Sequence, residues 1–261
     1  MKPLLKTLNT IKIAAFAGLT VMATASAAPA AEITFLCAGA LESTMKELIP
    51  EFQKTSGHNI NVTFAAIHII TERIRKGDIA DLAIVSPQQW EDLQKGGKLN
   101  SAVRVVIAKV GYGVFVKKEA AKPDIGSVDA FKRVFLNAKS VALFDLTLGG
   151  PTPTYTARLL DQLGISASVK PKSKFAKGPT ALFELVAKGE AEIGLAQISE
   201  ILAAPGIDLV GPMPADIQGF TIFTTAMPAN AKEPAAAKAL IEFLTSAKAV
   251  TLLKSKGLEP S

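Results

Sequence analysis

Cysteine and histidine are scarce in this chain of 261 residues, which has one cysteine, Cys37, and two histidines, His58 and His68. A single cysteine excludes a disulfide within the chain, so the fold must be held together by packing, and we expect Cys37 to be a small buried apolar residue. The two histidines do not have the spacing of a metal site. Ser43 and Ser86 lie outside any nucleophile-elbow context. The sequence therefore predicts no catalytic group, no metal and no cofactor.

The first 27 residues have the pattern of a secretory signal peptide. Lys2, Lys6 and Lys12 precede an apolar run over residues 13–23, which ends in the small residues 25–27. This run is too short for a typical transmembrane helix, which needs about 20 apolar residues. An uncleaved membrane anchor is the alternative. We expect a signal peptide over residues 1–27 and a periplasmic protein.

Net charge is low for a nucleic-acid-binding protein. The formal charge of +6 falls to +3 when residues 1–27 are set aside, because that segment holds three lysines and no acidic residue. Such a small excess, spread along the chain with few aromatic residues between the lysines, predicts no nucleic-acid partner. It is compatible with a small anionic ligand.

Short apolar runs alternate with segments of helical periodicity from residue 32 onward, which is the pattern of an α/β protein with mostly parallel sheets. The first series predicts strands at 33–37, 59–64 and 80–85, with helices between them. Residues 103–116 predict two strand segments interrupted by residues 111–113. The second series predicts helices at 128–136, 154–163 and 180–188 and strands at 140–144, 168–172, 191–196 and 207–210.

The two series resemble each other in plan, and the segments after residue 214 have no strand–helix partner of their own. These segments are a predicted strand at 219–227 and two helices that end near residue 254. We therefore expect two lobes, each a mostly parallel sheet flanked by helices, joined by two chain crossings near 113–117 and 214–220 around a hinged cleft. The predicted lobes are residues 28–113 with 220–261, and residues 114–219.

Four predicted strand-to-helix turns form the candidate binding site. In open α/β sheets, ligands collect beyond the carboxyl ends of the strands, where helix N-termini present free N–H groups and a partial positive charge. Glycine, proline and threonine in these turns allow close backbone approach and offer a hydroxyl, which suits anion capture, although simple helix capping is the alternative for any one turn. The turns contain Ala38, Gly39, Ala40, Ala66, Ile67, His68, Gly149, Gly150, Thr152, Lys177, Gly178 and Thr180.

Three residues in or near these turns have side chains with chemistry of their own. Lys177 is the best-placed fixed positive charge, and His68 is a candidate donor at a helix start, with a purely structural role as the alternative. Asp145 follows a predicted strand and is the one carboxylate considered for a catalytic role, since the paired acidic residues elsewhere are expected to be solvated; its alternative role is to brace the loop over residues 146–150.

Four segments carry a resemblance to a known family, and together they extend over essentially the whole chain after the predicted signal peptide. They are residues 33–41 (ITFLCAGAL), 80–86 (ADLAIVS), 154–157 (TYTA) and 189–195 (GEAEIGL). The chain resembles type II periplasmic substrate-binding proteins of ABC importers, and among them the molybdate-binding proteins. The resemblance implies a monomeric, non-enzymatic protein whose two lobes close over one small molecule, with a membrane permease and a cytoplasmic ATPase as partners.

The chain departs from the molybdate-binding pattern where the ligand is expected. The resemblance implies hydroxyls from the first two turns and a tyrosine late in the second lobe, but this chain has Ala40, residues 66–68 and Gln197 at those positions. We therefore expect an organic anion such as a carboxylate. Molybdate, tungstate or sulfate is the alternative, and a secreted enzyme on the same fold is a lesser one. The side chains expected to contact the ligand are His68, Thr152, Lys177 and Gln197.

Overall fold

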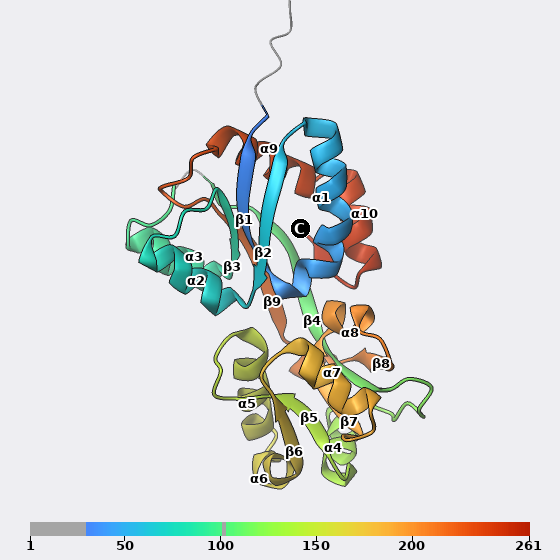
Figure 1. Cartoon of the computed structure of the whole chain (residues 1–261). Helices are drawn as coiled ribbons and strands as arrows, with labels where there is room; N and C mark the ends of the chain where they lie inside the picture. The colour runs from blue at the N-terminus through green and yellow to red at the C-terminus, as the bar shows by residue number, and fades with distance from the viewer. Residues whose placement is uncertain (1–29, 101–102) are drawn as a thin grey trace, which may run out of the picture.

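The computed structural model describes residues 30–100 and 103–261, so the predicted signal peptide lies outside the described residues. Figure 1 shows two lobes, each a β-sheet flanked by helices, with two strands running from one lobe to the other. This is the predicted two-lobed α/β architecture. Within the described residues, no helix is long and apolar enough to cross a membrane.

The first lobe contains a sheet with strand order β2-β1-β3-β9-β4. Strand β1 pairs in parallel with β2 and β3, whereas β9 and β4 are antiparallel additions, and β10 pairs with the first half of β4. The strands are β1 (Glu32–Ala38), β2 (Asn59–Ala65), β3 (Leu82–Val85), β4 (Val106–Lys117), β9 (Phe220–Ala226) and β10 (Glu259–Pro260). The helices are α1 (Glu42–Ser56), α2 (Ile67–Lys76), α3 (Pro87–Lys95), α9 (Pro234–Leu244) and α10 (Ala247–Ser255).

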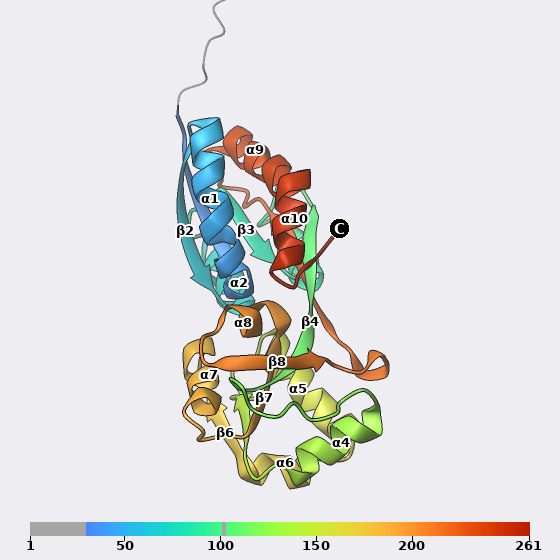
Figure 2. The same ribbon diagram turned by 90° about the vertical axis from the view of Figure 1, so that its right-hand side faces the viewer.

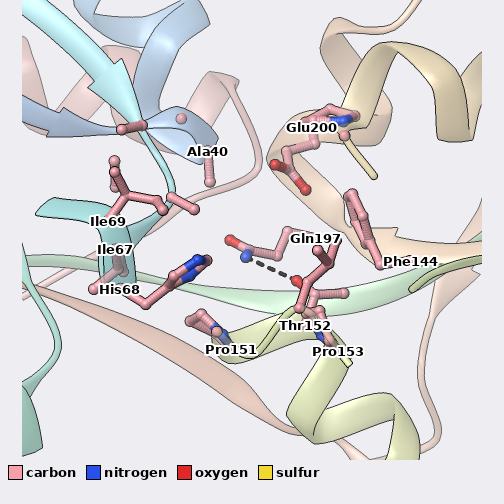
Figure 3. Close-up of a pocket in the computed structure, with 18 of the residues that line it drawn as sticks. Ala40, Ile67, His68, Ile69, Phe144, Pro151, Thr152, Pro153, Gln197 and Glu200 are labelled. Carbon is pink, nitrogen blue, oxygen red and sulfur yellow. Dashed lines mark hydrogen bonds between the residues drawn. The ribbon is translucent and has the colours of Figure 1, made fainter. Parts of the chain in front are cut away.

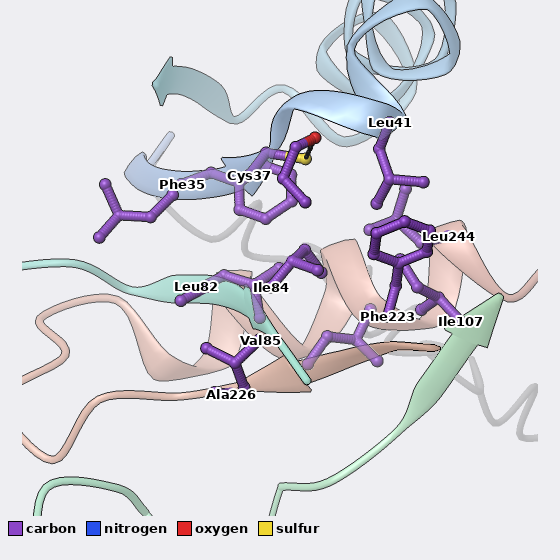
Figure 4. Packing of buried hydrophobic residues seen from close by; sticks show 14 of the residues in the cluster. Phe35, Cys37, Leu41, Leu82, Ile84, Val85, Ile107, Phe223, Ala226 and Leu244 are labelled. Carbon is purple, nitrogen blue, oxygen red and sulfur yellow. Dashed lines mark hydrogen bonds between the residues drawn. The ribbon is translucent and has the colours of Figure 1, made fainter. Parts of the chain in front are cut away.

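The core of the first lobe follows directly from its apolar pattern. Figure 4 shows β1, β3 and β9 presenting fully buried side chains such as Phe35, Ile84 and Phe223 to one another. Cys37 is buried in this cluster, as predicted, and burial raises the pKa of its thiol well above the usual value. The apolar spacing of the first lobe therefore specifies its packing without any covalent bridge.

The second lobe has the strand order β4-β7-β5-β6, with β8 on β4. Strand β5 is parallel to β6 and β7, and β4 is antiparallel to β7 and β8, so in both lobes antiparallel strands extend a parallel core. The strands are β5 (Val141–Phe144), β6 (Ser173–Ala176), β7 (Ile193–Gln197) and β8 (Ile207–Pro212). The helices are α4 (Val128–Asn137), α5 (Pro151–Gln162), α6 (Ser166–Val169), α7 (Pro179–Ala187) and α8 (Ile198–Ala203).

One prediction of a strand was wrong. Residues 168–172 were expected to form a strand, but they lie in α6 and in a 3₁₀ turn over Lys170–Lys172, and β6 begins only at Ser173. Pro171 explains the shift, because its ring fixes φ and it has no N–H to donate to a sheet. The chain must pass the proline before a strand can pair with β5.

Strand β4 belongs to both lobes. Gly111 pairs with Phe220 of β9, and the next residue, Tyr112, pairs with Gln197 of β7. The two predicted strand segments are therefore one continuous strand, and the glycines within it allow close packing. A methyl group on Gly113 would lie 2.9 Å from the side chain of Leu209.

The return crossing is fastened to β4 by a side chain. The Gln218 amide accepts a hydrogen bond from the Tyr112 backbone N–H at 2.9 Å and donates one to the Tyr112 carbonyl at 3.0 Å. Figure 2 shows β4 passing between the lobes, with the loop that leads into β9 beside the second lobe. The two crossings thus lie side by side, at one edge of the interface between the lobes.

Candidate ligand-binding cleft

A cavity of about 430 Å³ lies between the lobes, at the carboxyl ends of the parallel strands. All but one of the turn residues predicted from the sequence line it, and Gln197 lines it as well. The exception is Thr180, which is exposed and lines a neighbouring groove with Ser43 and Glu184. Thr180 lies one residue beyond Pro179, and it is Pro179 that reaches the cavity. The four turns are therefore brought together, but Thr180 faces away from them.

In the described structure, three helices of nine or more residues begin at the cavity without a hydrogen bond from the N-cap side chain, as does the shorter α8, whose N-cap is Gln197. The N-cap residues of α2, α5 and α7 are Ala66, Gly150 and Gly178, and in the part of the chain that the structure describes none of them makes a capping hydrogen bond. Their first N–H groups and the positive ends of their dipoles are thus available to an anion. Among the helices that start away from the cavity, α3, α4 and α10 are capped by Ser86, Ser127 and Ser246. The N-cap residues of α6 and α9 make no side-chain capping hydrogen bond in the described structure.

His68 and Gly150 bring the two lobes into contact at the cavity. A methyl group on Gly150 would lie 3.1 Å from Nδ1 of His68, so the imidazole of one lobe packs against the bare backbone of the other. Gly150 also has φ of 86°, which a residue with a side chain rarely adopts. Figure 3 shows the His68 ring pointing into the space between the lobes, above Pro151. Glycine is required here for both reasons.

These features were compared with known proteins. Residues 33–259 match the family model of the bacterial extracellular solute-binding proteins. The chain belongs to this family.

This solute-binding protein is similar to relatives that have different names and functions. It is 30% identical over 241 residues to a protein named aconitate isomerase from Pseudomonas sp, with 90% of each chain covered. It is 25% identical over 229 residues to the molybdate-binding protein ModA of Escherichia coli (strain K12), covering 87% of this chain and 88% of ModA. The similarity to molybdate-binding proteins that the sequence predicted is therefore confirmed.

The fold is confirmed by solved structures. The periplasmic molybdate-binding protein of Azotobacter vinelandii superposes with a TM-score of 0.71 at 18% identity, covering 87% of this chain and 98% of that protein. At this level of identity the match concerns the fold alone. The solute-binding protein thus has the two-lobed fold of type II periplasmic binding proteins.

Gln197 of the solute-binding protein is held by a buried network. Its Nε2 donates to Oγ1 of Thr152 at 3.1 Å, and Thr152 is hydrogen-bonded in turn to the hydroxyl of Tyr112. The Tyr112 hydroxyl lies 2.9 Å from Oγ1 of Thr221, its ring stacks on Tyr155 at 4.0 Å, and burial raises its pKa to about 12. The network fixes the side-chain amide of Gln197 at the floor of the cavity, next to the crossing strand.

Three buried polar atoms of the cavity-lining residues make no hydrogen bond within residues 30–100 and 103–261. They are Nδ1 of His68, Oε1 of Gln197 and Oε2 of Glu200, which we call the free polar atoms. Buried polar atoms are normally paired, so such a set marks a place where a partner is to be supplied. The free polar atoms come from both lobes, as a ligand that holds the lobes together would require.

Glu200 was not among the predicted site residues. It lies in the first turn of α8, three residues after the N-cap Gln197, and its carboxyl accepts a hydrogen bond from the Gln197 backbone N–H. Burial nevertheless raises its pKa to about 7, because the charged form loses its hydration. The sequence signal for this role was the N-cap–x–x–Glu spacing, but that spacing marks only a helix start.

The two remaining charged candidates differ in their relation to the cavity. Lys177 is exposed at its edge, where its ammonium can reach a bound anion. Asp145 is absent from the cavity lining in the described structure; its carboxylate accepts hydrogen bonds from the backbone N–H and the hydroxyl of Thr147, at 3.0 and 2.7 Å, which lower its pKa. Asp145 therefore braces its loop, the alternative role stated above.

The cavity offers hydrogen-bond donors rather than metal ligands. Among the described residues, no group of three or more His, Cys, Asp or Glu side chains is arranged to hold a metal ion. The cavity lining presents helix-start amides, the ammonium group of Lys177 and the polar side chains of His68, Thr152 and Gln197. It also contains the carboxyls of Glu42 and Glu200, and burial raises the pKa of Glu200 to about 7. This set can hold an anion and can move a proton.

Proposed function

We propose that this solute-binding protein captures a small organic anion of carboxylate type outside the cytoplasm and delivers it to an ABC permease. The observation that supports this proposal is the set of three uncapped helix starts around one cavity. Backbone N–H groups at the start of a helix can bind an anion by themselves, and no strongly basic side chain is needed beside them. The cavity volume of about 430 Å³ lies within the range of roughly 300–1,000 Å³ used for small organic ligands.

The choice of an organic anion over a tetrahedral oxyanion depends on the first lobe. Its two turns present Ala40 and Ala66 where hydroxyls would suit a tetrahedral oxyanion. The relative named aconitate isomerase acts, by its name, on a tricarboxylate, which supports the organic reading. The relative named as molybdate-binding supports molybdate, tungstate or sulfate as the alternative.

Titration calorimetry of the purified protein tests this proposal. We expect a heat of binding with members of a panel of di- and tricarboxylates and none with molybdate, tungstate or sulfate at equal concentration. The protein is first unfolded and refolded, so that any ligand retained during purification is removed. Tight binding of a tetrahedral oxyanion with no response to any carboxylate would overturn the proposal.

Lys177 provides a test at the level of one residue. We expect Lys177→Ala to weaken binding about tenfold, since a charge-assisted hydrogen bond contributes about 1.5–3 kcal/mol and exposure reduces that value. Lys174→Ala is the matched control, because Lys174 lies three residues earlier, outside the cavity lining, and pairs with Glu190 at 3.6 Å. Equal affinity of the two variants would show that Lys177 is only a solvated surface residue.

A second candidate function is isomerisation of the bound anion. Two observations favour it: the carboxyl of Glu200, whose pKa is about 7, lines the cavity, and the relative at 30% identity is named aconitate isomerase. A carboxyl that titrates near the working pH is suited to take up and return a proton. If the protein only captures its ligand, proton NMR spectra of cis- and trans-aconitate incubated with it remain unchanged. Interconversion of the two at a rate proportional to protein concentration would establish the enzyme instead.

A further inference from the structure

We propose that Glu200 binds the ligand in its protonated form and donates a hydrogen bond to a ligand carboxylate, so that capture of the anion takes up one proton from solvent. This inference rests on the proposed function and makes Glu200 a specificity-determining residue of the same cleft. It predicts that the cleft selects ligands by their ability to share a proton as well as by charge.

The position of Glu200 supports this role. Figure 3 shows its carboxyl reaching from α8 of the second lobe into the cavity, on the side opposite His68. Its Oε2 is one of the free polar atoms, buried and without a partner among the described residues. The Glu200 carboxyl accepts one hydrogen bond, from the Gln197 backbone N–H, and its second oxygen is available to a ligand in the cleft.

Repulsion between the carboxylate of Glu200 and a carboxylate of the ligand favours the protonated form of Glu200 once a ligand is bound. An ionised Glu200 beside a ligand carboxylate would place two negative charges in a site shielded from water, which is strongly unfavourable. A single proton shared between the two carboxyls converts this repulsion into a charge-assisted hydrogen bond. Because burial already raises the pKa of Glu200 to about 7, supplying that proton near neutral pH costs little free energy.

The acidic neighbours of Glu200 are paired with lysines, so they do not replace Glu200 as the group that takes up the proton. Around Glu200, Glu42 of α1 pairs with Lys46 at 2.6 Å, and Glu184 of α7 pairs with Lys188 at 2.7 Å. The hydroxyl of Tyr112 on β4 has a pKa of about 12 and stays neutral. In the part of the chain that the structure describes, the titratable groups that line the cavity besides Glu200 are Glu42 of α1, His68 of α2 and Lys177, before α7. The imidazole of His68 carries one of the free polar atoms, so the experiment separates it from Glu200.

Calorimetry in two buffers of different ionisation enthalpy, phosphate and Tris, measures the proton uptake. The probes are citrate, cis-aconitate and trans-aconitate at pH 7.5. For each probe that binds the wild type, we expect uptake of more than half a proton, and an affinity that falls by up to about tenfold per pH unit between pH 7 and 9. Glu200→Gln, which mimics the protonated acid, should bind within about threefold of the wild type at pH 7.5, without proton uptake and without this pH dependence.

His68→Asn is the matched variant, and it should retain the proton uptake whatever its affinity. The inference is overturned if the wild type binds a probe without proton uptake, or if the uptake persists in Glu200→Gln and disappears in His68→Asn. If Glu200→Gln does not fold, the ¹³C shift of the Glu200 carboxyl in the wild type, with and without probe, decides the same point. Binding of molybdate or sulfate alone would defeat both the proposed function and this inference, whereas binding of a carboxylate without proton uptake would defeat this inference alone.

Discussion

At the scale of the residue, Gly150 is the position where one added carbon affects both lobes. Gly150→Ala should destabilise the protein by about 1 kcal/mol, because alanine is strained at positive φ, and should also weaken ligand binding, because its methyl group would press on His68. Gly164→Ala is the control, since Gly164 has φ of 67° but open space around its Cβ, away from the cavity. Chemical denaturation and ligand titration of both variants separate the two effects. A loss of affinity in Gly164→Ala as large as in Gly150→Ala would contradict this view.

Glu200 also makes the stability of the ligand-free protein depend on pH. Its pKa of about 7 in the folded protein lies above the ordinary 4.5, so between those values the folded state holds a proton that the unfolded state has lost. The contribution of Glu200 to stability is therefore fully present below pH 4.5 and is lost as pH rises through 7, by on the order of 3 kcal/mol at most. Thermal melts from pH 4.5 to 8 should show this decline in the wild type. In Glu200→Gln the decline should be smaller by that amount, and identical profiles would refute the assignment.

At the scale of the element, the helix starts at the cleft lack a side-chain cap, whereas α3, α4 and α10 start elsewhere and are capped by serines. Ser127→Ala removes the hydrogen bond from the Ala130 N–H, 3.2 Å long, and should cost about 1 kcal/mol of stability with no change in ligand affinity.

Gly178→Asp should lower ligand affinity with no change in stability. The space around its Cβ is open, so the protein should keep its stability, while a carboxylate at this helix start should repel an anion and lower affinity at least tenfold, roughly 1.4 kcal/mol. Denaturation and calorimetry on both variants give the comparison, and unchanged affinity in Gly178→Asp would show that α7 does not bind the ligand.

Elements with a strong local signal were predictable from the sequence, and those that depend on distant packing were not. Helices α1 and α2 end at Gly57 and Gly77, both left-handed, where apolar periodicity and glycine coincide in the sequence. Strand β6 was misplaced because the effect of Pro171 outweighed a short apolar run. The turns of the candidate site were found by their position after strands. Glu200 was missed because the spacing that contains it marks only a helix start, and Thr180 lies outside the cavity lining because a single step along a helix turns a side chain by about 100°.

At the scale of the whole molecule, a buried hydrogen bond joins the two lobes in addition to the contacts at the cavity. Oγ of Ser199 in the second lobe donates to the carbonyl of Ala40 in the first at 2.9 Å. Ser199→Ala should weaken ligand affinity about 2–10-fold, because a hydrogen bond that joins the lobes stabilises the form in which they lie together by about 0.5–1.5 kcal/mol.

A hydrogen bond of the same kind within one lobe is the control for Ser199. Ser173 donates to the Val169 carbonyl at 2.8 Å, and both residues belong to the second lobe. Ser173→Ala should leave affinity unaltered and reduce only stability. Calorimetry gives the affinities, and small-angle scattering of the ligand-free variants should show a larger radius of gyration for Ser199→Ala alone. Equal scattering and equal affinity for the two variants would mean that the Ser199 contact does not influence closure.

The pairing of β3 with β9 joins residues near the beginning of the chain to residues near its end, since Ala83 lies opposite Ala226. The second lobe, by contrast, is formed from one uninterrupted stretch between the crossings. During synthesis this later stretch can become complete while the earlier half-sheet still has an unpaired edge, which is a surface prone to aggregation. The first lobe thus completes its sheet only after β9 has been made, although β1, β2 and β3 are translated before the second lobe.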